Sequence, residues 1–204
     1  MNLEFAAATA YLTCGALMMF LGFVVLRENP RQRVNLATAA MLMFGALGPI
    51  LGAYGDFGER GQGAGIQDLF SRFGFLWEFF FPAAVLFALV FPTLHPVLRR
   101  WPRLDVLLFV PHAFHVVMVM LAPESATLLD QIDPSGPLAR AGGLGRLAAE
   151  LLLRIHVRFF SFVNLAMVGT SMVLLMRSAR KTTNPKLRSQ IGVIRYGLVF
   201  GLML

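Results

Sequence analysis

Long runs of apolar residues, separated by short arginine-rich turns, constrain this 204-residue chain more than any other feature. A bilayer core about 30 Å thick needs about 20 apolar residues in a helix to cross it. Hydrophobic residues make up 57% of the chain and charged residues only 14%, against about 45–50% and about 25% in soluble domains. The composition excludes a disordered chain, a disulfide scaffold and an ordinary soluble enzyme. It predicts an all-α, polytopic helical membrane protein.

The apolar runs predict one helical membrane domain over residues 1–204 with six visible transmembrane helices. The spans cover about residues 5–26, 34–54, 73–94, 104–121, 159–176 and 191–204. The fifth span belongs to a longer helix, residues 147–176, whose first half is expected at or above the interface. The last run gives only about 21 Å of helix, so we expect this span to be incomplete and to continue beyond Leu204.

The charges of the turns predict the orientation of these helices. Cytoplasmic loops of membrane proteins carry an excess of Lys and Arg. The turns between the apolar runs alternate between the two sides of the membrane, and one side carries most of the basic residues. The loops on the other side contain only four basic residues, with acidic residues around them: Arg60, Arg72, Arg140 and Arg146. We therefore expect the N-terminus outside a bacterial cytoplasmic membrane. The basic residues on the side expected to be cytoplasmic are Arg27, Arg31, Arg33, Arg99, Arg100, Arg103, Arg177, Arg180, Lys181, Lys186 and Arg188.

The net charge of +7 does not point to nucleic acid, because the basic residues lie beside apolar runs, where they meet anionic lipid head groups. Cys14 is the only cysteine, which excludes an intrachain disulfide and a cysteine metal site. The expected partners are the lipid bilayer and either other membrane subunits or a second copy of the chain.

Three segments resemble a known family. Residues 26–37 (LRENPRQRVNLA) resemble the first cytoplasmic turn of the seven-helix N-terminal input region of bacterial sensor histidine kinases and diguanylate cyclases. Residues 87–92, which end in Phe-Pro, look like the end of that family's third helix, and residues 184–190 are similar to its basic turn before helix six. The resemblance implies an input domain with its output domain downstream. No phosphoacceptor segment, ATP-binding motif or cyclase signature occurs in these residues.

Glu78 is a candidate ligand-binding or proton site, because an acid within a membrane span costs at least about 2.5 kcal/mol unless it is paired or protonated. The alternative is a structural ion pair with Arg72 or Arg158 near the outer interface. Arg154 and Arg158 are four residues apart and share a helix face, so they are candidates to bind an anionic ligand or outer-leaflet lipid head groups. A ligand site is expected in an outer cavity near Glu78, Arg154 and Arg158. The alternative for both arginines is snorkelling at the interface.

His112 and His115 lie three residues apart on the fourth span, so both rings share a helix face. Hydrogen bonding between helices is the favoured interpretation. Ligation of a metal, a haem or a chlorin magnesium, and proton sensing, are the alternatives. No cofactor is predicted.

The leading functional hypothesis is a non-enzymatic signal-input domain that couples an outer or intramembrane cue to a cytoplasmic output. The alternative is an accessory or structural subunit of a larger membrane complex, of the photosynthetic or respiratory type, that contributes helix packing. A transporter ranks third, because internal repeats and several intramembrane ionisable residues are not evident.

Overall fold

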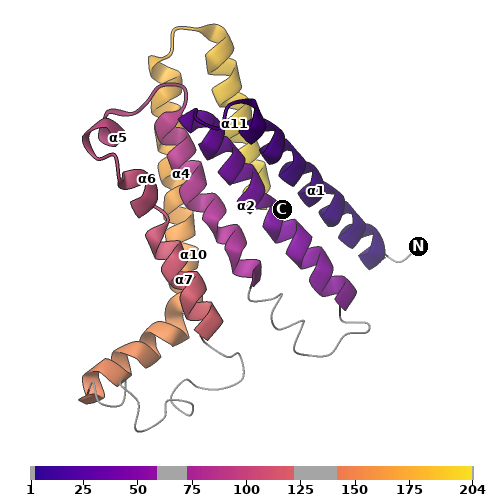
Figure 1. The fold of residues 1–204 in the computed structure, drawn as a ribbon, viewed down its shortest axis with the longest axis vertical. Helices are drawn as coiled ribbons and strands as arrows, with labels where there is room; N and C mark the ends of the chain where they lie inside the picture. Colours follow the sequence, from indigo (N-terminus) through magenta and orange to yellow (C-terminus); the bar gives the residue numbers. More distant parts are fainter. Residues whose placement is uncertain (1–2, 59–72, 122–141, 204) are drawn as a thin grey trace.

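The computed structural model describes residues 3–58, 73–121 and 142–203, and these ranges form helices joined by short turns (Figure 1). The all-α prediction is confirmed for this part of the chain, which contains no strand. The elements are α1 (Leu3–Glu28), α2 (Arg33–Gly58), η1 (Phe75–Phe79, a 3₁₀ helix), α4 (Phe80–Val90), α5 (Pro96–Arg100), α6 (Leu104–Leu107), α7 (Val110–Leu121), α10 (Gly142–Lys181) and α11 (Pro185–Met203).

Three helical segments are long and apolar enough to cross a membrane: Phe5–Glu28, Arg33–Leu51 and Ile155–Lys181. Two further apolar segments, Phe75–Val90 and Leu104–Met120, are shorter. By length and composition the described residues therefore support three spans, compatible with a membrane protein, where the sequence predicted six.

The helix predicted over residues 73–94 is shorter in the structure, where the described segment is helical from residue 73 to Val90. The segment includes η1, and α4 ends at Val90 because Phe91 adopts an extended backbone (φ −114°, ψ 137°). Pro92 is the cause, since the ring of a proline disfavours helical backbone in the residue before it.

The span predicted over residues 104–121 is interrupted, because α6 ends at Leu107 and α7 starts only at Val110. Pro111 lacks an N–H and its ring clashes with the carbonyl four residues earlier, which belongs to Leu107. Phe109 then starts a new set of helical hydrogen bonds by accepting from the N–H of Ala113 at 2.9 Å.

The helices after residue 142 extend further than predicted. α10 has 40 residues and continues to Lys181, and α11 begins at Pro185 rather than near residue 191. The side-chain oxygen of Asn184 accepts from the backbone N–H of Lys186 at 3.0 Å. An Asn cap followed by Pro at the first helical position is a strong helix start.

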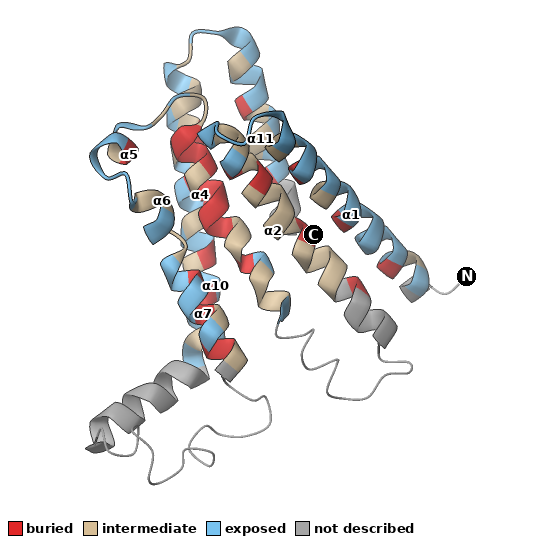
Figure 2. Cartoon of the chain, viewed as in Figure 1, coloured by how far each residue is buried: buried red, intermediate tan, exposed pale blue. Residues whose placement is uncertain are grey.

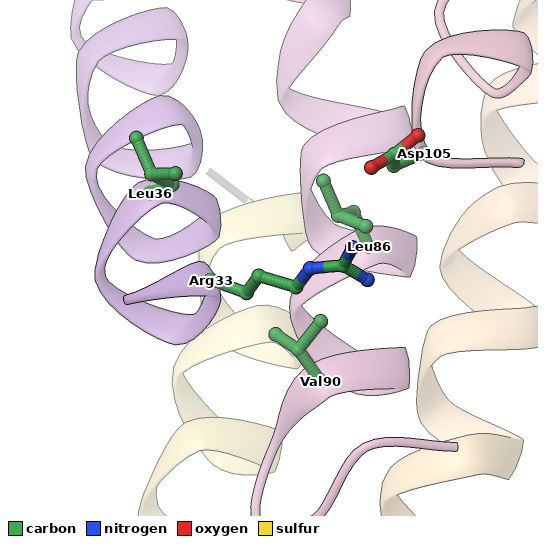
Figure 3. A pocket seen from close by; sticks show the side chains of 5 residues that line it. All are labelled: Arg33, Leu36, Leu86, Val90 and Asp105. Carbon is green, nitrogen blue, oxygen red and sulfur yellow. The ribbon is translucent and has the colours of Figure 1, made fainter. Parts of the chain in front are cut away.

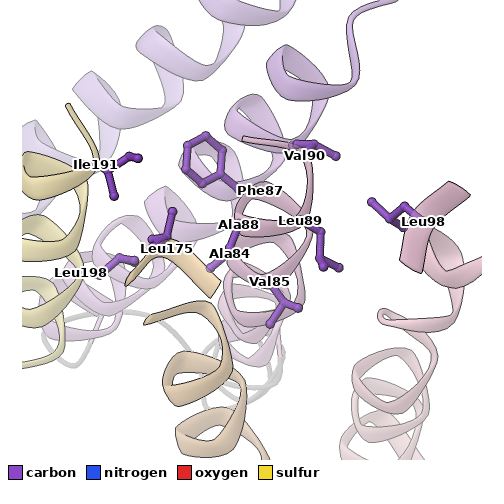
Figure 4. Packing of buried hydrophobic residues seen from close by; sticks show 11 residues of the cluster. Ala84, Val85, Phe87, Ala88, Leu89, Val90, Leu98, Leu175, Ile191 and Leu198 are labelled. Carbon is purple, nitrogen blue, oxygen red and sulfur yellow. The ribbon is translucent and has the colours of Figure 1, made fainter. Parts of the chain in front are cut away.

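Helix α4 lies at the centre of the bundle, between α2 and α10 (Figure 1). Nearly every residue from Phe81 to Val90 is buried, which explains the concentration of buried residues on α4 in Figure 2. Phe87, Ala84 and Ala88 belong to the same apolar cluster as residues of α10 and α11 (Figure 4). The cluster comprises Ala37, Ala84, Val85, Phe87, Ala88, Leu89, Val90, Leu98, Leu175, Ile191 and Leu198.

The turn between α1 and α2, the segment with α5, and the turn between α10 and α11 lie at the same end of the bundle (Figure 1). Leu98 of α5 is buried and joins the apolar cluster, which holds this segment against α4. We call this the basic end, because the three segments carry the clustered arginines and lysines of the sequence.

Two glycines allow α1 to pack closely on α2. A Cβ added to Gly15 would lie 2.6 Å from Cγ1 of Ile50, and one added to Gly22 would lie 2.7 Å from Cγ of Met43. Small residues let helix backbones approach in this way in membranes, where lipid contact removes the hydrophobic drive for association.

We expect Gly15→Ala and Gly22→Ala to lower the free energy of unfolding by about 1–3 kcal/mol each, because an added methyl forces α1 away from α2. Gly169→Ala is the matched control, since nothing lies within 4 Å of its added Cβ. Denaturant titration of the purified protein measures the difference. Equal effects for all three substitutions would contradict close packing of α1 on α2.

Candidate functional site

Glu78 in η1 is buried, with 6% of its surface exposed. Its Oε2 lies 2.6 Å from Nδ1 of His115, which is fully buried on α7. With the carboxylate ionised, Nδ1–H of His115 donates to Oε2, and this charge-assisted bond offsets part of the cost of burying the acid. The bond joins η1 to α7.

The second ring nitrogen of His115 extends the contact to a third helix. Nε2 of His115 lies 3.0 Å from Nδ1 of His156 on α10, and His156 is half-buried. We call Glu78, His115 and His156 the polar chain. It forms two hydrogen bonds in series and connects η1, α7 and α10.

Aromatic rings fix the orientation of His115. The ring of Phe160 stacks on it at a centroid distance of 3.9 Å and an interplanar angle of 2°, and Phe75 meets it edge-on at 5.3 Å. Imidazole nitrogens form hydrogen bonds in the plane of the ring, and the stacked Phe160 restricts the tilt of that plane, in which Glu78 and His156 are bound. The stacking therefore holds both hydrogen bonds in alignment.

His112, one turn before His115 on α7, forms a separate contact with α10. Its Nε2 lies 2.7 Å from Oδ1 of Asn164, so Nε2–H donates to the amide oxygen. The other nitrogen, Nδ1, is buried without a hydrogen-bond partner. Such an orphaned buried atom costs free energy, which marks His112 as a polar group in an unusually apolar setting.

The prediction that His112 and His115 hydrogen-bond between helices is confirmed by these contacts. Metal or pigment ligation by the pair stays a prediction. In the described ranges no three His, Cys, Asp or Glu side chains form a group that could hold a metal ion. The geometry gives the reason, since the nitrogens of His115 are directed at Glu78 and His156 instead of a common point.

Of the arginines predicted near Glu78, the structure describes only the side chain of Arg158, which does not pair with it. Arg158 is exposed, and among the described residues Glu78 forms its ion pair with His115. Arg72 and the side chain of Arg154 lie outside the described residues. A structural ion pair between Glu78 and Arg158 is therefore wrong, because Glu78 faces the interior and Arg158 does not.

Sequence reasoning missed His156, Phe160 and Asn164 as members of the site. The three residues are spaced by four, so they lie on one face of α10. The neighbouring arginines obscured this pattern. The sequence does contain a signal for this site, because a His and an Asn lie eight residues apart on one helix face. The same face continues through Val168, Ser171 and Leu175, and these three residues are buried.

A small hollow lies between α2, α4 and α6, apart from the polar chain. It has a volume of about 70 Å³ and is lined by Arg33, Leu36, Leu86, Val90 and Asp105 (Figure 3). The side chain of Arg33 extends across it toward α4. Its size suits a few water molecules better than a ligand, so the polar chain is the stronger candidate site.

We expect Glu78→Ala to lower the free energy of unfolding by about 1–3 kcal/mol, because Nδ1 of His115 would be left buried without its acceptor. Glu78→Gln should cost less, since an amide oxygen can accept the same hydrogen bond. Arg158→Ala, at an exposed position on α10, should stay within about 0.5 kcal/mol. Thermal unfolding of the purified variants measures the order, and a harmless Glu78→Ala would contradict the structural role of the bond.

Models of known protein families give no match to this chain, and no curated protein or solved structure matches it either. Similarity to another protein therefore supplies no function. The resemblance carried by residues 26–37, 87–92 and 184–190 stays a prediction. The chemistry of the polar chain is what bears on function.

Proposed function

We propose that the chain is a non-enzymatic membrane signal-input domain, which couples an outer or intramembrane cue to a cytoplasmic output domain. The observation that carries the proposal is the polar chain. Ionisable groups buried in a membrane bundle are costly and are therefore functional candidates by default. Here they connect three helices, so any change in their charge or hydrogen bonding alters how those helices pack.

Helix α10 provides the route from the polar chain to the basic end. His156 and Lys181 lie on the same uninterrupted helix, about 37 Å apart along its axis. A helix of this length moves as a rigid element, and small shifts of packed helices are a known means of signal transmission. A displacement of α10 at His156 would therefore reach the turn to α11.

The proposed topology has six crossings, with the N-terminus outside a bacterial cytoplasmic membrane and the basic end in the cytoplasm. The shared position of the three basic segments at one end of the bundle supports this orientation. The shorter apolar segments Phe75–Val90 and Leu104–Met120 would serve as the third and fourth crossings. The polar chain then lies toward the outer side.

Cysteine labelling tests the orientation. In a Cys14→Ser background, which removes the only cysteine, Asn29→Cys and Thr183→Cys should react with a membrane-impermeant maleimide only after permeabilisation. Gln62→Cys should react in intact cells. The reverse pattern would overturn the proposed topology, because the basic turns would then be outside.

The intact mass of the protein purified from native membranes tests the function. A mass well above the 22.5 kDa of these residues, with peptides of a cytoplasmic domain beyond Leu204, is expected for an input domain. A mass close to 22.5 kDa in a complex of fixed stoichiometry would overturn the proposal and favour the accessory subunit.

A further inference from the structure

The position of the polar chain gives it access to one side of the membrane. The candidate membrane span on the described part of α10 covers Ile155–Lys181, so it contains His156 near the end that is remote from the basic end. A hydrocarbon core about 30 Å thick corresponds to about 20 residues of helix. If the core starts at the basic end of α10, then a stretch of that length counted back along the helix ends before it reaches His156. His156 therefore lies at the boundary of the apolar core, and Glu78 is the buried end of the chain.

The hydrogen bonds have a defined direction when Glu78 is ionised. Nδ1–H of His115 donates to the carboxylate, which leaves a lone pair on Nε2 of His115. Nδ1–H of His156 donates to that lone pair, which leaves a lone pair on Nε2 of His156. Among the described residues none hydrogen-bonds to this last nitrogen. The chain thus ends, within the described residues, in a proton acceptor on its half-buried member.

We propose that the polar chain is a proton-binding site, in which a proton taken up at His156 is relayed to Glu78. The inference deepens the proposed function by naming its cue. A proton binds Nε2 of His156, the proton on Nδ1 of His156 passes to Nε2 of His115, and the proton on Nδ1 of His115 passes to Oε2 of Glu78. One proton enters, both hydrogen bonds persist with reversed direction, and both histidines end neutral with the proton on Nε2.

Proton uptake changes the charge of the chain from −1 to 0, and no hydrogen bond is lost. The bond between Glu78 and His115 changes from charge-assisted to neutral, and bonds to ionised partners are about twice as strong. Uptake therefore weakens the contact of η1 with α7. That loosening is the packing change that α10 can transmit to the basic end.

Few other charges face the polar chain within the described helices packed against it. On α7 the other titratable side chain is His112, and on α10 the nearest charged side chain described is the exposed Arg158. α4 contributes no titratable residue, and neither does α2 between residues 34 and 53.

Nitrogen-15 NMR of histidine-labelled protein in lipid nanodiscs tests the proposal, because it distinguishes the two neutral tautomers from imidazolium. The chain has four histidines, and single substitutions to Gln assign them. On acidification His115 should change from mainly the Nδ1–H tautomer to mainly the Nε2–H tautomer. Infrared difference spectra should gain one protonated carboxyl band. A His115 signal that stays unchanged, or becomes imidazolium beside an ionised Glu78, overturns the relay.

Glu78→Gln removes the terminal proton acceptor and should abolish both the tautomer change and the carboxyl band. His95→Gln is the matched control, since His95 is an exposed helix cap outside the polar chain, and it should retain both signals. If Glu78→Gln does not fold, the presence or absence of the tautomer change in the wild-type protein is sufficient to test the relay. If the relay is found but the protein is a 22.5 kDa subunit of a complex, the signalling function is refuted and the relay stands. If the protein is an input domain but the histidine tautomers do not reverse, the relay is refuted and the signalling function stands.

Discussion

The burial of Glu78 is the constraint on which the junction of three helices depends. A carboxylate buried among apolar helices is costly unless a partner compensates, and the partner is His115 at 2.6 Å. Because His115 belongs to α7, the pair fixes that helix against η1. The remaining nitrogen of His115 requires a partner of its own, which brings His156 of α10 to the same place. One buried charge thus determines the relative position of three segments far apart in sequence.

The two ends of the central helices have different chemistry. Toward the basic end, α4 packs against α10 and α11 through small and aliphatic side chains such as Ala84, Ala88 and Leu175, which form a close-packed cluster. Toward the other end, the contacts of η1, α7 and α10 are polar and aromatic, with Phe160 stacked on His115. Close-packed cores resist deformation, whereas the strength of the polar contact depends on protonation. Under the proposed function, a change at the polar end would move the helices about a firm apolar contact.

The helical fold class and the hydrogen bonding of His112 and His115 between helices followed from the sequence, because apolar length and polar residues within apolar runs are local signals. The partners did not follow, because the pairing of Glu78 depends on which helices meet. His156 stands between Arg154 and Arg158, so composition assigned it to a charged interfacial stretch. The helix breaks before Pro92 and Pro111 were predictable from proline stereochemistry, but the apolar runs continue through both and dominated the span assignment.

The linear geometry of the polar chain separates its chemistry from that of a metal centre. Metal ligands direct their lone pairs at one point, with three or four donors around the ion. In the polar chain each nitrogen of His115 is directed at a different partner, and the face of its ring is covered by Phe160. An ion placed between one nitrogen and its partner atom would have only those two ligands among the members of the polar chain, whereas a proton needs only one donor and one acceptor at each step. Hydrogen bonds of 2.6 and 3.0 Å in series satisfy that requirement, and the half-buried His156 connects them to the boundary of the apolar core.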